Sequence, residues 1–137
     1  MAHKIFVDTN IIIYAYTNDK EGRTPKAIEF LKSISQFNNY ISIQVINEFC
    51  NVLLYNNVPF NDINEYLIEI ENSFFILPID FYTAQNGLYV KQKYNYKWFD
   101  SLLLASALEN QCSIFYSEDM HHNHIIEKKM KIINPFK

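Results

Sequence analysis

The stretch Lys4-Ile5-Phe6-Val7-Asp8-Thr9-Asn10 decides the fold class. Ile5, Phe6 and Val7 form a continuous apolar run, which is typical of a parallel strand that is covered on both faces. Asp8 stands where that strand would end. Because ligands of open α/β sheets collect in the crevice beyond the carboxyl ends of the strands, Asp8 is the first candidate site residue.

Length and composition limit the class of protein. The chain has 137 residues, and we expect residues 1–137 to form a single domain. A hydrophobic content of 49% excludes a disordered chain, and only two glycines and four prolines argue against an all-β fold with many tight turns. The net charge of -3 neither indicates nor excludes a nucleic-acid partner.

The cysteines and the absence of targeting signals predict a cytoplasmic location. Cys50 and Cys112 lie far apart in the sequence without metal-ligand spacing, so we expect reduced thiols. We expect no signal peptide and no membrane association, because the first strand begins almost at once and no long apolar segment follows.

The rest of the chain alternates between helical and extended patterns. The spacing predicts helices over 11–16, 24–37, 44–55, 61–72, 80–93 and 98–110, and strands over 40–43, 74–77, 112–117 and 131–134. Thr24, Asn61 and Asp80 are expected to cap helices, and residues 125–129 are interpreted as a short helical turn. This alternation predicts a three-layer α/β/α sandwich with a central parallel sheet of about five strands.

Four of the fifteen acidic residues do not fit a simple surface role. Asp8 and Asp119 follow the ends of two apolar strands, Asp100 heads the apolar stripe of a helix, and Glu48 lies next to the inward face of another. If the first and fourth strands are neighbours, Asp8 and Asp119 meet at the switch point of the sheet, and Asp100 can lie beside them. Structural alternatives remain open: Asp8 as a helix cap, Asp100 as a first-turn acid, and Glu48 as a surface acid.

Converging carboxylates predict a site for a hard cation. Carboxylates in one crevice repel one another, and oxygen ligands without paired Cys or His favour Mg²⁺ or Mn²⁺ over zinc. We therefore expect Asp8, Asp100 and Asp119 to be metal ligands. A site of this kind suits hydrolysis of phosphodiesters by water that the metal activates.

Four motifs together resemble the PIN-domain ribonucleases, particularly the VapC-type toxins of bacterial toxin–antitoxin modules. They are Val7-Asp8-Thr9-Asn10, Trp98-Phe99-Asp100-Ser101-Leu102 with Ala105 and Ala107, Tyr116-Ser117-Glu118-Asp119-Met120, and Ile132-Ile133-Asn134-Pro135-Phe136. The resemblance spans essentially the whole chain, in order and spacing. One departure is His121-His122-Asn123-His124, which stands where many relatives carry a glycine after the last aspartate.

The resemblance implies a Mg²⁺- or Mn²⁺-dependent endoribonuclease with a PIN-like fold. It implies that Asp8, Glu48, Asp100 and Asp119 form the catalytic acidic set, with Asn10 and Ser117 as polar supports. It also implies a homodimer that a cognate antitoxin inhibits. Which RNA is cleaved remains open, since transfer, ribosomal and messenger RNA would all meet the same acids.

The segment from Tyr89 to Trp98 is a candidate RNA-binding surface. Lys91, Lys93 and Lys97 alternate there with aromatic residues that include Tyr94 and Trp98, a combination that holds single-stranded RNA in other proteins. The alternative is a solvated helix end with half-buried aromatic rings. The three histidines at 121, 122 and 124 lack accompanying cysteines, so a zinc site is disfavoured, and contact with RNA phosphate stays open.

Other functions fit the sequence less well. A haloacid-dehalogenase-type phosphatase needs a second aspartate where Asn10 stands, and a receiver-like phosphoacceptor needs a different acid pair and a late lysine. Gly22 and Gly87 alone cannot form a Rossmann or P-loop motif. The remaining alternative is a catalytically inactive PIN-like domain that serves as an RNA- or protein-binding scaffold.

An inhibitor of such a site is expected to act through charge. Arginine pairs well with carboxylates, so an antitoxin should insert a basic residue among the four acids. The rest of its inhibitory segment should cover apolar grooves between the early helices, where we expect Ile12, Tyr16 and Phe49 to be partly exposed.

Overall fold

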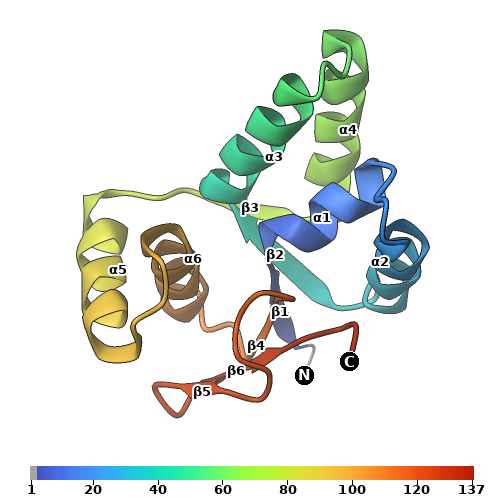
Figure 1. Ribbon diagram of the computed structural model, residues 1–137. Helices are drawn as coiled ribbons and strands as arrows, with labels where there is room; N and C mark the ends of the chain where they lie inside the picture. The colour runs from blue at the N-terminus through green and yellow to red at the C-terminus, as the bar shows by residue number, and fades with distance from the viewer. Residues whose placement is uncertain (1–2) are drawn as a thin grey trace.

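The computed structural model describes residues 3–137, which form six strands and six helices in three layers (Figure 1). The strands are β1 (Lys4–Val7), β2 (Asn38–Ser42), β3 (Phe75–Leu77), β4 (Ile114–Tyr116), β5 (Ile125–Ile126) and β6 (Met130–Ile133). The helices are α1 (Thr9–Tyr16), α2 (Arg23–Ser33), α3 (Ile43–Tyr55), α4 (Phe60–Ser73), α5 (Phe81–Tyr94) and α6 (Trp98–Glu109). The predicted α/β/α fold is confirmed.

The sheet has the order β3-β2-β1-β4-β6-β5, with β1 near its centre. β1 pairs in parallel with β2 on one side and with β4 on the other, so the chain first builds the sheet in one direction and then returns to build it in the other. Helices α1 and α2 lie on one side of the sheet and α5 and α6 on the other, while α3 and α4 form a pair that projects away from it (Figure 1). The carboxyl ends of β1 and β4 therefore form the switch point that the sequence predicted.

The sheet differs from the prediction at its last edge. It has six strands among the described residues, and the predicted helical turn over 125–129 is instead part of an antiparallel β5–β6 hairpin. The Lys129 N–H donates to the Ile126 carbonyl (3.0 Å), and the two residues between them, Glu127 and Lys128, have φ of 52° and 57°. Positive φ at both central residues is the usual hairpin geometry, but glycine or asparagine normally occupies these positions, so the sequence carried no turn signal.

Two helix starts also differ from the prediction. α2 begins at Arg23 after Gly22 (φ 78°), and Thr24 does not cap it. The Thr24 hydroxyl instead donates to the Thr17 carbonyl (2.9 Å) and accepts from the Asp19 N–H (3.0 Å), which closes the loop between α1 and α2. α4 begins at Phe60 after Pro59, so the predicted cap Asn61 lies inside the helix. Asp80 caps α5 as predicted, through a capping box with Thr83.

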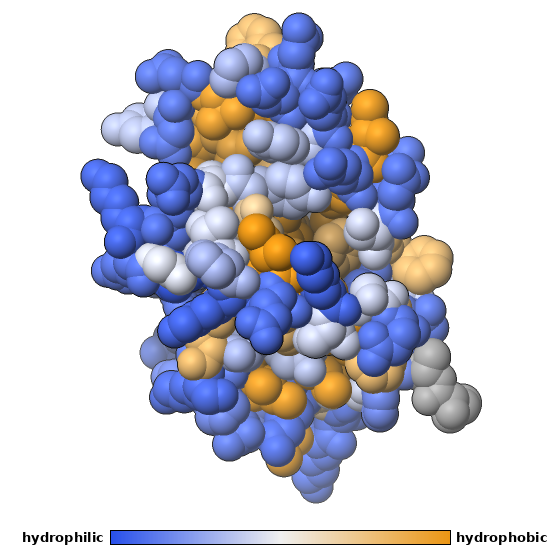
Figure 2. Space-filling view, turned by 90° about the vertical axis from the view of Figure 1, so that its right-hand side faces the viewer, coloured by the Kyte–Doolittle hydropathy of each residue, from blue (hydrophilic) through white to orange (hydrophobic). Residues whose placement is uncertain are grey.

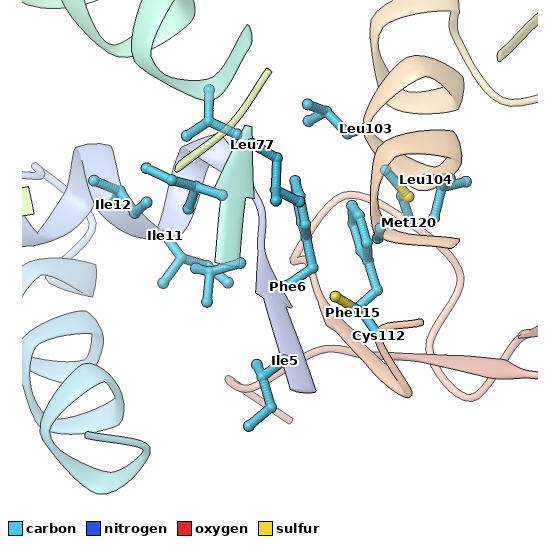
Figure 3. Packing of buried hydrophobic residues seen from close by; sticks show 14 of the residues in the cluster. Ile5, Phe6, Ile11, Ile12, Leu77, Leu103, Leu104, Cys112, Phe115 and Met120 are labelled. Carbon is cyan, nitrogen blue, oxygen red and sulfur yellow. The ribbon is translucent and has the colours of Figure 1, made fainter. Parts of the chain in front are cut away.

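The core lies on both faces of the central strands. Phe6 of β1 and Phe115 of β4 stack in parallel at 5.0 Å between ring centroids, next to Leu103 and Leu104 of α6 (Figure 3). Ile11 of α1 lies on the opposite side of β1 (Figure 3). Because side chains alternate along a strand, the unbroken apolar run of β1 supplies both layers.

Cys50 and Cys112 are both free, and burial raises the pKa of the Cys112 thiol to about 12. Over residues 3–137, no helix combines the length and the apolar character that crossing a membrane would need.

Candidate active site

Asp8 is held at the junction of β1 and α1. Its N–H continues the β1–β4 pairing by donating to the Tyr116 carbonyl (2.9 Å). Its side chain caps α1, because Oδ1 accepts from the Thr9 N–H (2.7 Å). Its other oxygen, Oδ2, accepts from the Ser117 hydroxyl (2.8 Å), and the residue is only 5% exposed. The carboxylate is therefore fixed in position before any ligand binds.

Asp119 lies on the loop that follows β4, and two polar residues hold it. The Ser117 hydroxyl accepts from the Asp119 N–H (3.2 Å) while it donates to Asp8, so it links the ends of β1 and β4. The Asn10 amide donates to Asp119 Oδ2. Both of the predicted polar supports thus contact predicted acidic residues.

Glu48 reaches the same region from α3. Its Oε2 accepts from the Thr9 hydroxyl (2.8 Å), which joins α3 to the first turn of α1. α3 itself begins at Ser42, whose hydroxyl accepts from the Val45 N–H (3.4 Å) directly after β2. Glu48 is therefore placed by the carboxyl end of β2 and is half-buried, so it is not a fully exposed surface acid.

Asp100 lies in the first turn of α6 and completes the group. Asp8, Glu48, Asp100 and Asp119 all line one pocket of about 440 Å³. Its other lining residues are Thr9, Asn10, Ile13, Asn51, Val52, Lys97, Trp98 and Phe99. Acidic residues from four separate segments thus converge where the sequence predicted a site.

Burial and the charges of neighbouring acids raise the pKa of Asp8, Glu48 and Asp100. Burial, together with the charges of Asp100 and Glu48, raises the pKa of Asp8 to about 7, although its hydrogen bonds oppose the change. Burial and the charge of Asp119 raise the pKa of Asp100. Burial and the charge of Asp100 raise the pKa of Glu48. Neighbouring acids therefore repel one another when all of them are charged.

The donors at this pocket are of the kind that hard divalent cations prefer. They are carboxylate oxygens, and no histidine or cysteine lines the pocket. Within residues 3–137 no three acidic, His or Cys side chains are already gathered as a metal site. Instead, Asp8 and Glu48 accept hydrogen bonds from Thr9, and Asp119 accepts one from Asn10.

Glu118, the neighbour of Asp119, belongs to a different network. Its Oε1 accepts from the Tyr14 hydroxyl (2.7 Å) and pairs with Arg23 (3.0 Å). Arg23 also pairs with Asp19 (2.8 Å) and lies over the Tyr14 ring. This network ties the loop after β4 to α1 and α2, and Glu118 does not line the acidic pocket.

The predicted RNA-binding segment is divided between two places. Lys97 and Trp98 line the acidic pocket, whereas Lys91, Lys93 and Tyr94 lie on α5 away from its lining. Lys93 pairs with Glu127 (2.5 Å), and the Tyr94 hydroxyl donates to the same carboxylate (2.6 Å). These two side chains hold the β5–β6 turn in the structure.

The histidines after Asp119 pack against the body of the protein. His122 Nδ1 accepts from the Asn134 N–H (2.9 Å), and His124 Nδ1 shares a hydrogen bond with the Tyr96 hydroxyl (2.6 Å). The His121 ring lies edge-on to Tyr96, with ring centroids 5.6 Å apart. These contacts anchor the loop that follows Asp119.

Sequence reasoning missed five residues of this pocket, of which Ile13 and Val52 are apolar. Thr9, Asn51 and Phe99 all line it and were not predicted as site residues. Asn51 lies one helical turn after Glu48, and Thr9 and Phe99 are immediate neighbours of Asp8 and Asp100, so position relative to the acids could have identified all three.

Comparisons with known proteins agree with this geometry. The PIN domain family model matches residues 5–128. No curated protein matches the sequence significantly.

Solved structures share the fold at low sequence identity. A toxin–antitoxin complex from Klebsiella pneumoniae has a TM-score of 0.68 at 19% identity, over 96% of this chain and 97% of that one. Mycobacterium tuberculosis VapC20, a Sarcin-Ricin loop cleaving toxin, has a TM-score of 0.68 at 15% identity, over 81% and 86%. FitAcB from Neisseria gonorrhoeae has a TM-score of 0.64 at 16% identity, over 96% and 98%. With the family model matching most of its length, the chain belongs to the PIN domain family.

Proposed function

We propose that this protein is an endoribonuclease toxin of the VapC type, which hydrolyses RNA phosphodiester bonds with Mg²⁺ or Mn²⁺. The observation that carries the proposal is the convergence of Asp8, Glu48, Asp100 and Asp119 on one pocket at the carboxyl ends of β1 and β4. Neighbouring negative charges help to raise the pKa of Asp8, Glu48 and Asp100, and carboxylates that repel one another in this way suit a site that binds a cation.

The residues present fit a hard divalent cation. Asp8, Asp100 and Asp119 would hold it, because their carboxylates border the same pocket and the pKa of Asp8 is raised to about 7 by burial and by neighbouring acids. A bound Mg²⁺ or Mn²⁺ supplies neutralising charge and lowers the pKa of water, which favours attack on a phosphodiester.

The remaining polar groups keep the acids in place. Ser117 fixes Asp8 relative to Asp119, and Thr9 fixes Glu48 relative to Asp8. Asn10 holds the far oxygen of Asp119. Because these hydrogen bonds restrain Asp8, Glu48 and Asp119, these three carboxylates lose little freedom when the substrate arrives.

The proposal extends to partners and location. The solved structures that share the fold include a toxin–antitoxin complex and a toxin that cleaves the Sarcin-Ricin loop. We infer a single-domain toxin that forms a homodimer, acts on RNA in the cytoplasm and is held inactive by an antitoxin. A mass of twice 16.3 kDa in light scattering is the expected result for the homodimer.

The exposure of the early helices differs from the sequence prediction. Ile12 and Phe49 are fully buried, so the expectation that they are exposed was wrong, and only Tyr16 is partly exposed. Tyr16 lines a groove of about 560 Å³ together with apolar residues of α2 such as Leu31. Figure 2, which views the side of the molecule that carries α2, shows hydrophobic side chains around a hollow. This groove suits the apolar part of an inhibitory segment, and a basic residue of that segment would enter the acidic pocket.

Cleavage of RNA by the purified protein, freed of any partner, tests the proposed function. We expect structured RNA to be cut in Mg²⁺ or Mn²⁺, and we expect excess EDTA to stop the reaction reversibly. Full activity in excess EDTA would contradict the metal-dependent mechanism. Absence of cleavage under all these conditions, on several RNA classes, would favour the inactive scaffold.

A further inference from the structure

Two aromatic side chains border the acidic pocket directly before Asp100. Trp98 and Phe99 both line the pocket, and they remain 37% and 51% exposed. At this exposure neither ring is part of the hydrophobic core. They are available to a ligand that enters the pocket.

The Trp98 ring packs against α5 at Gly87. A Cβ atom at Gly87 would lie 3.4 Å from Cη2 of Trp98 and 3.3 Å from Cδ1 of Leu102. Gly87 is buried in the interior of α5, where glycine is less favourable than alanine. The close approach of α6 explains the glycine, and this contact holds one end of the indole of a residue that also lines the pocket.

We propose that Trp98 and Phe99 form a stacking site for one nucleobase of the bound RNA, next to the phosphodiester that is cut. This inference rests on the proposed function and adds a residue pair that selects and positions the nucleotide. Bases stack on aromatic side chains whenever they are splayed out of a helix. An indole that is already held in place loses little freedom on stacking.

A lysine beside the two rings offers a contact for the phosphate of a nucleotide, which an apolar peptide would not use. Lys97 directly precedes the two rings, is exposed and lines the same pocket. It therefore places a cation where the phosphate of a stacked nucleotide can reach it, and it partly offsets the repulsion from the acids. Lys93 and Tyr94 have their own partner in Glu127, so the inferred site lies at the pocket and not along α5.

Trp98 is the only tryptophan of the chain, so its fluorescence reports on this site alone. The protein is titrated in Mg²⁺ with adenosine 5′-monophosphate, which has no phosphodiester to be cut, and with ribose 5-phosphate as the base-free control. We expect saturable quenching by the nucleotide and none by the sugar phosphate. Equal responses, or no response to either, would overturn the proposal.

Phe99→Ala keeps the reporter and removes the second ring. We expect at least about fivefold weaker binding of the nucleotide, the lower limit for loss of one stacking contact. Tyr89→Ala is the matched control, because Tyr89 is 51% exposed like Phe99 but lies on α5 outside the pocket. The control should bind within about twofold of wild type. Equal effects of the two substitutions would overturn the proposal.

Cleavage separates this inference from the proposed function. Trp98→Ala should raise KM for RNA with a smaller change in kcat, and Trp98→Phe should restore most of the KM. Nucleotide quenching in a protein that never cuts RNA would support the base site and reject the nuclease. RNA cleavage without quenching of Trp98 fluorescence by the nucleotide would reject the base site and leave the nuclease intact. Quenching that only a bound inhibitor protein causes would have the same meaning.

Discussion

At the scale of the residue, Asp8 performs two tasks that the sequence presented as alternatives. It caps α1 through the Thr9 N–H, and it lines the acidic pocket with the other three acids. The two roles are compatible because the two carboxylate oxygens have different partners. Oδ1 accepts from the Thr9 N–H at the start of α1, and Oδ2 accepts from the Ser117 hydroxyl. The cost of the arrangement is a buried carboxylate whose pKa is raised to about 7.

The raised pKa of Asp8 sets the pH dependence of stability without metal. The folded state keeps a proton that the unfolded chain releases between the ordinary pKa of 3.8 and about 7, so this group makes the free energy of unfolding fall as pH rises through that window. The contribution is most unfavourable above pH 7. We expect Asp8→Asn to melt higher than wild type at pH 8 in EDTA, by roughly 3 °C for each kcal/mol of repulsion removed.

Thermal melts at pH 5.5 and pH 8 in EDTA measure this effect. The difference in Tm between the two pH values should be smaller for Asp8→Asn than for wild type, and Mg²⁺ should stabilise wild type more than the variant. A variant that melts below wild type at pH 8 would mean that the hydrogen bonds of the carboxylate outweigh the repulsion.

Glu118 and Asp119 are adjacent acids with different surroundings. Glu118 pairs with Arg23 and Tyr14, whereas Asp119 lines the pocket. We therefore expect Asp119→Asn to lose at least ~10²-fold in cleavage rate, because it removes a metal ligand. Glu118→Gln should lower Tm slightly and leave the rate within about threefold of wild type. Comparable losses of cleavage rate in the two variants would mean that Asp119 has been assigned to the site in error.

At the scale of the element, the sequence predicted the parts that follow from periodicity and strand ends. The apolar run of β1 identified the central strand, and the pairing of β1 with β4 brought Asp8 and Asp119 to one pocket as expected. The β5–β6 hairpin was missed because its turn uses Glu127 and Lys128 with positive φ. Contacts of Glu127 with Lys93 and Tyr94 stabilise that turn, and such distant contacts leave no local pattern.

Ser117 joins two of these elements and can be tested against a matched serine. Ser117→Ala removes the hydroxyl that contacts both Asp8 and Asp119, so we expect roughly tenfold slower cleavage from misplaced carboxylates. It should also raise the pKa of Asp8 further, because the lost hydrogen bond favours the charged form. The pH profile of cleavage should therefore shift to higher pH.

Ser106→Ala provides the control for that substitution. Ser106 is equally buried in α6, and among residues 3–137 its hydroxyl has no hydrogen-bond partner. The control should keep the wild-type rate and equal or exceed the wild-type Tm. If Ser117→Ala behaves like the control in both rate and pH profile, Ser117 does not position the acids.

At the scale of the whole molecule, the sheet topology explains why the site could be predicted from sequence in outline but not in detail. Three of the four acids follow a strand or open a helix, and positions of this kind are visible in a sequence once the sheet order is anticipated. Glu48 lies inside α3 and is a weaker signal. Thr9 and Phe99 are adjacent to two of these acids in the sequence, but their place in the pocket also depends on how α1 and α6 pack. The packing of Trp98 against Gly87 depends on the approach of α5 and α6, so neither sequence segment alone predicts it.

The cleavage rate of Asp100→Asn relative to wild type, measured on RNA in saturating Mg²⁺, tests the central claim most directly. Asp62→Asn is the matched control, because Asp62 also lies in the first turn of a helix but outside the acidic pocket. We predict a loss of at least ~10²-fold for Asp100→Asn and an unchanged rate for the control, since only Asp100 would hold the metal. An undiminished rate in Asp100→Asn, with wild type active, would contradict the claim that these converging acids carry the reaction.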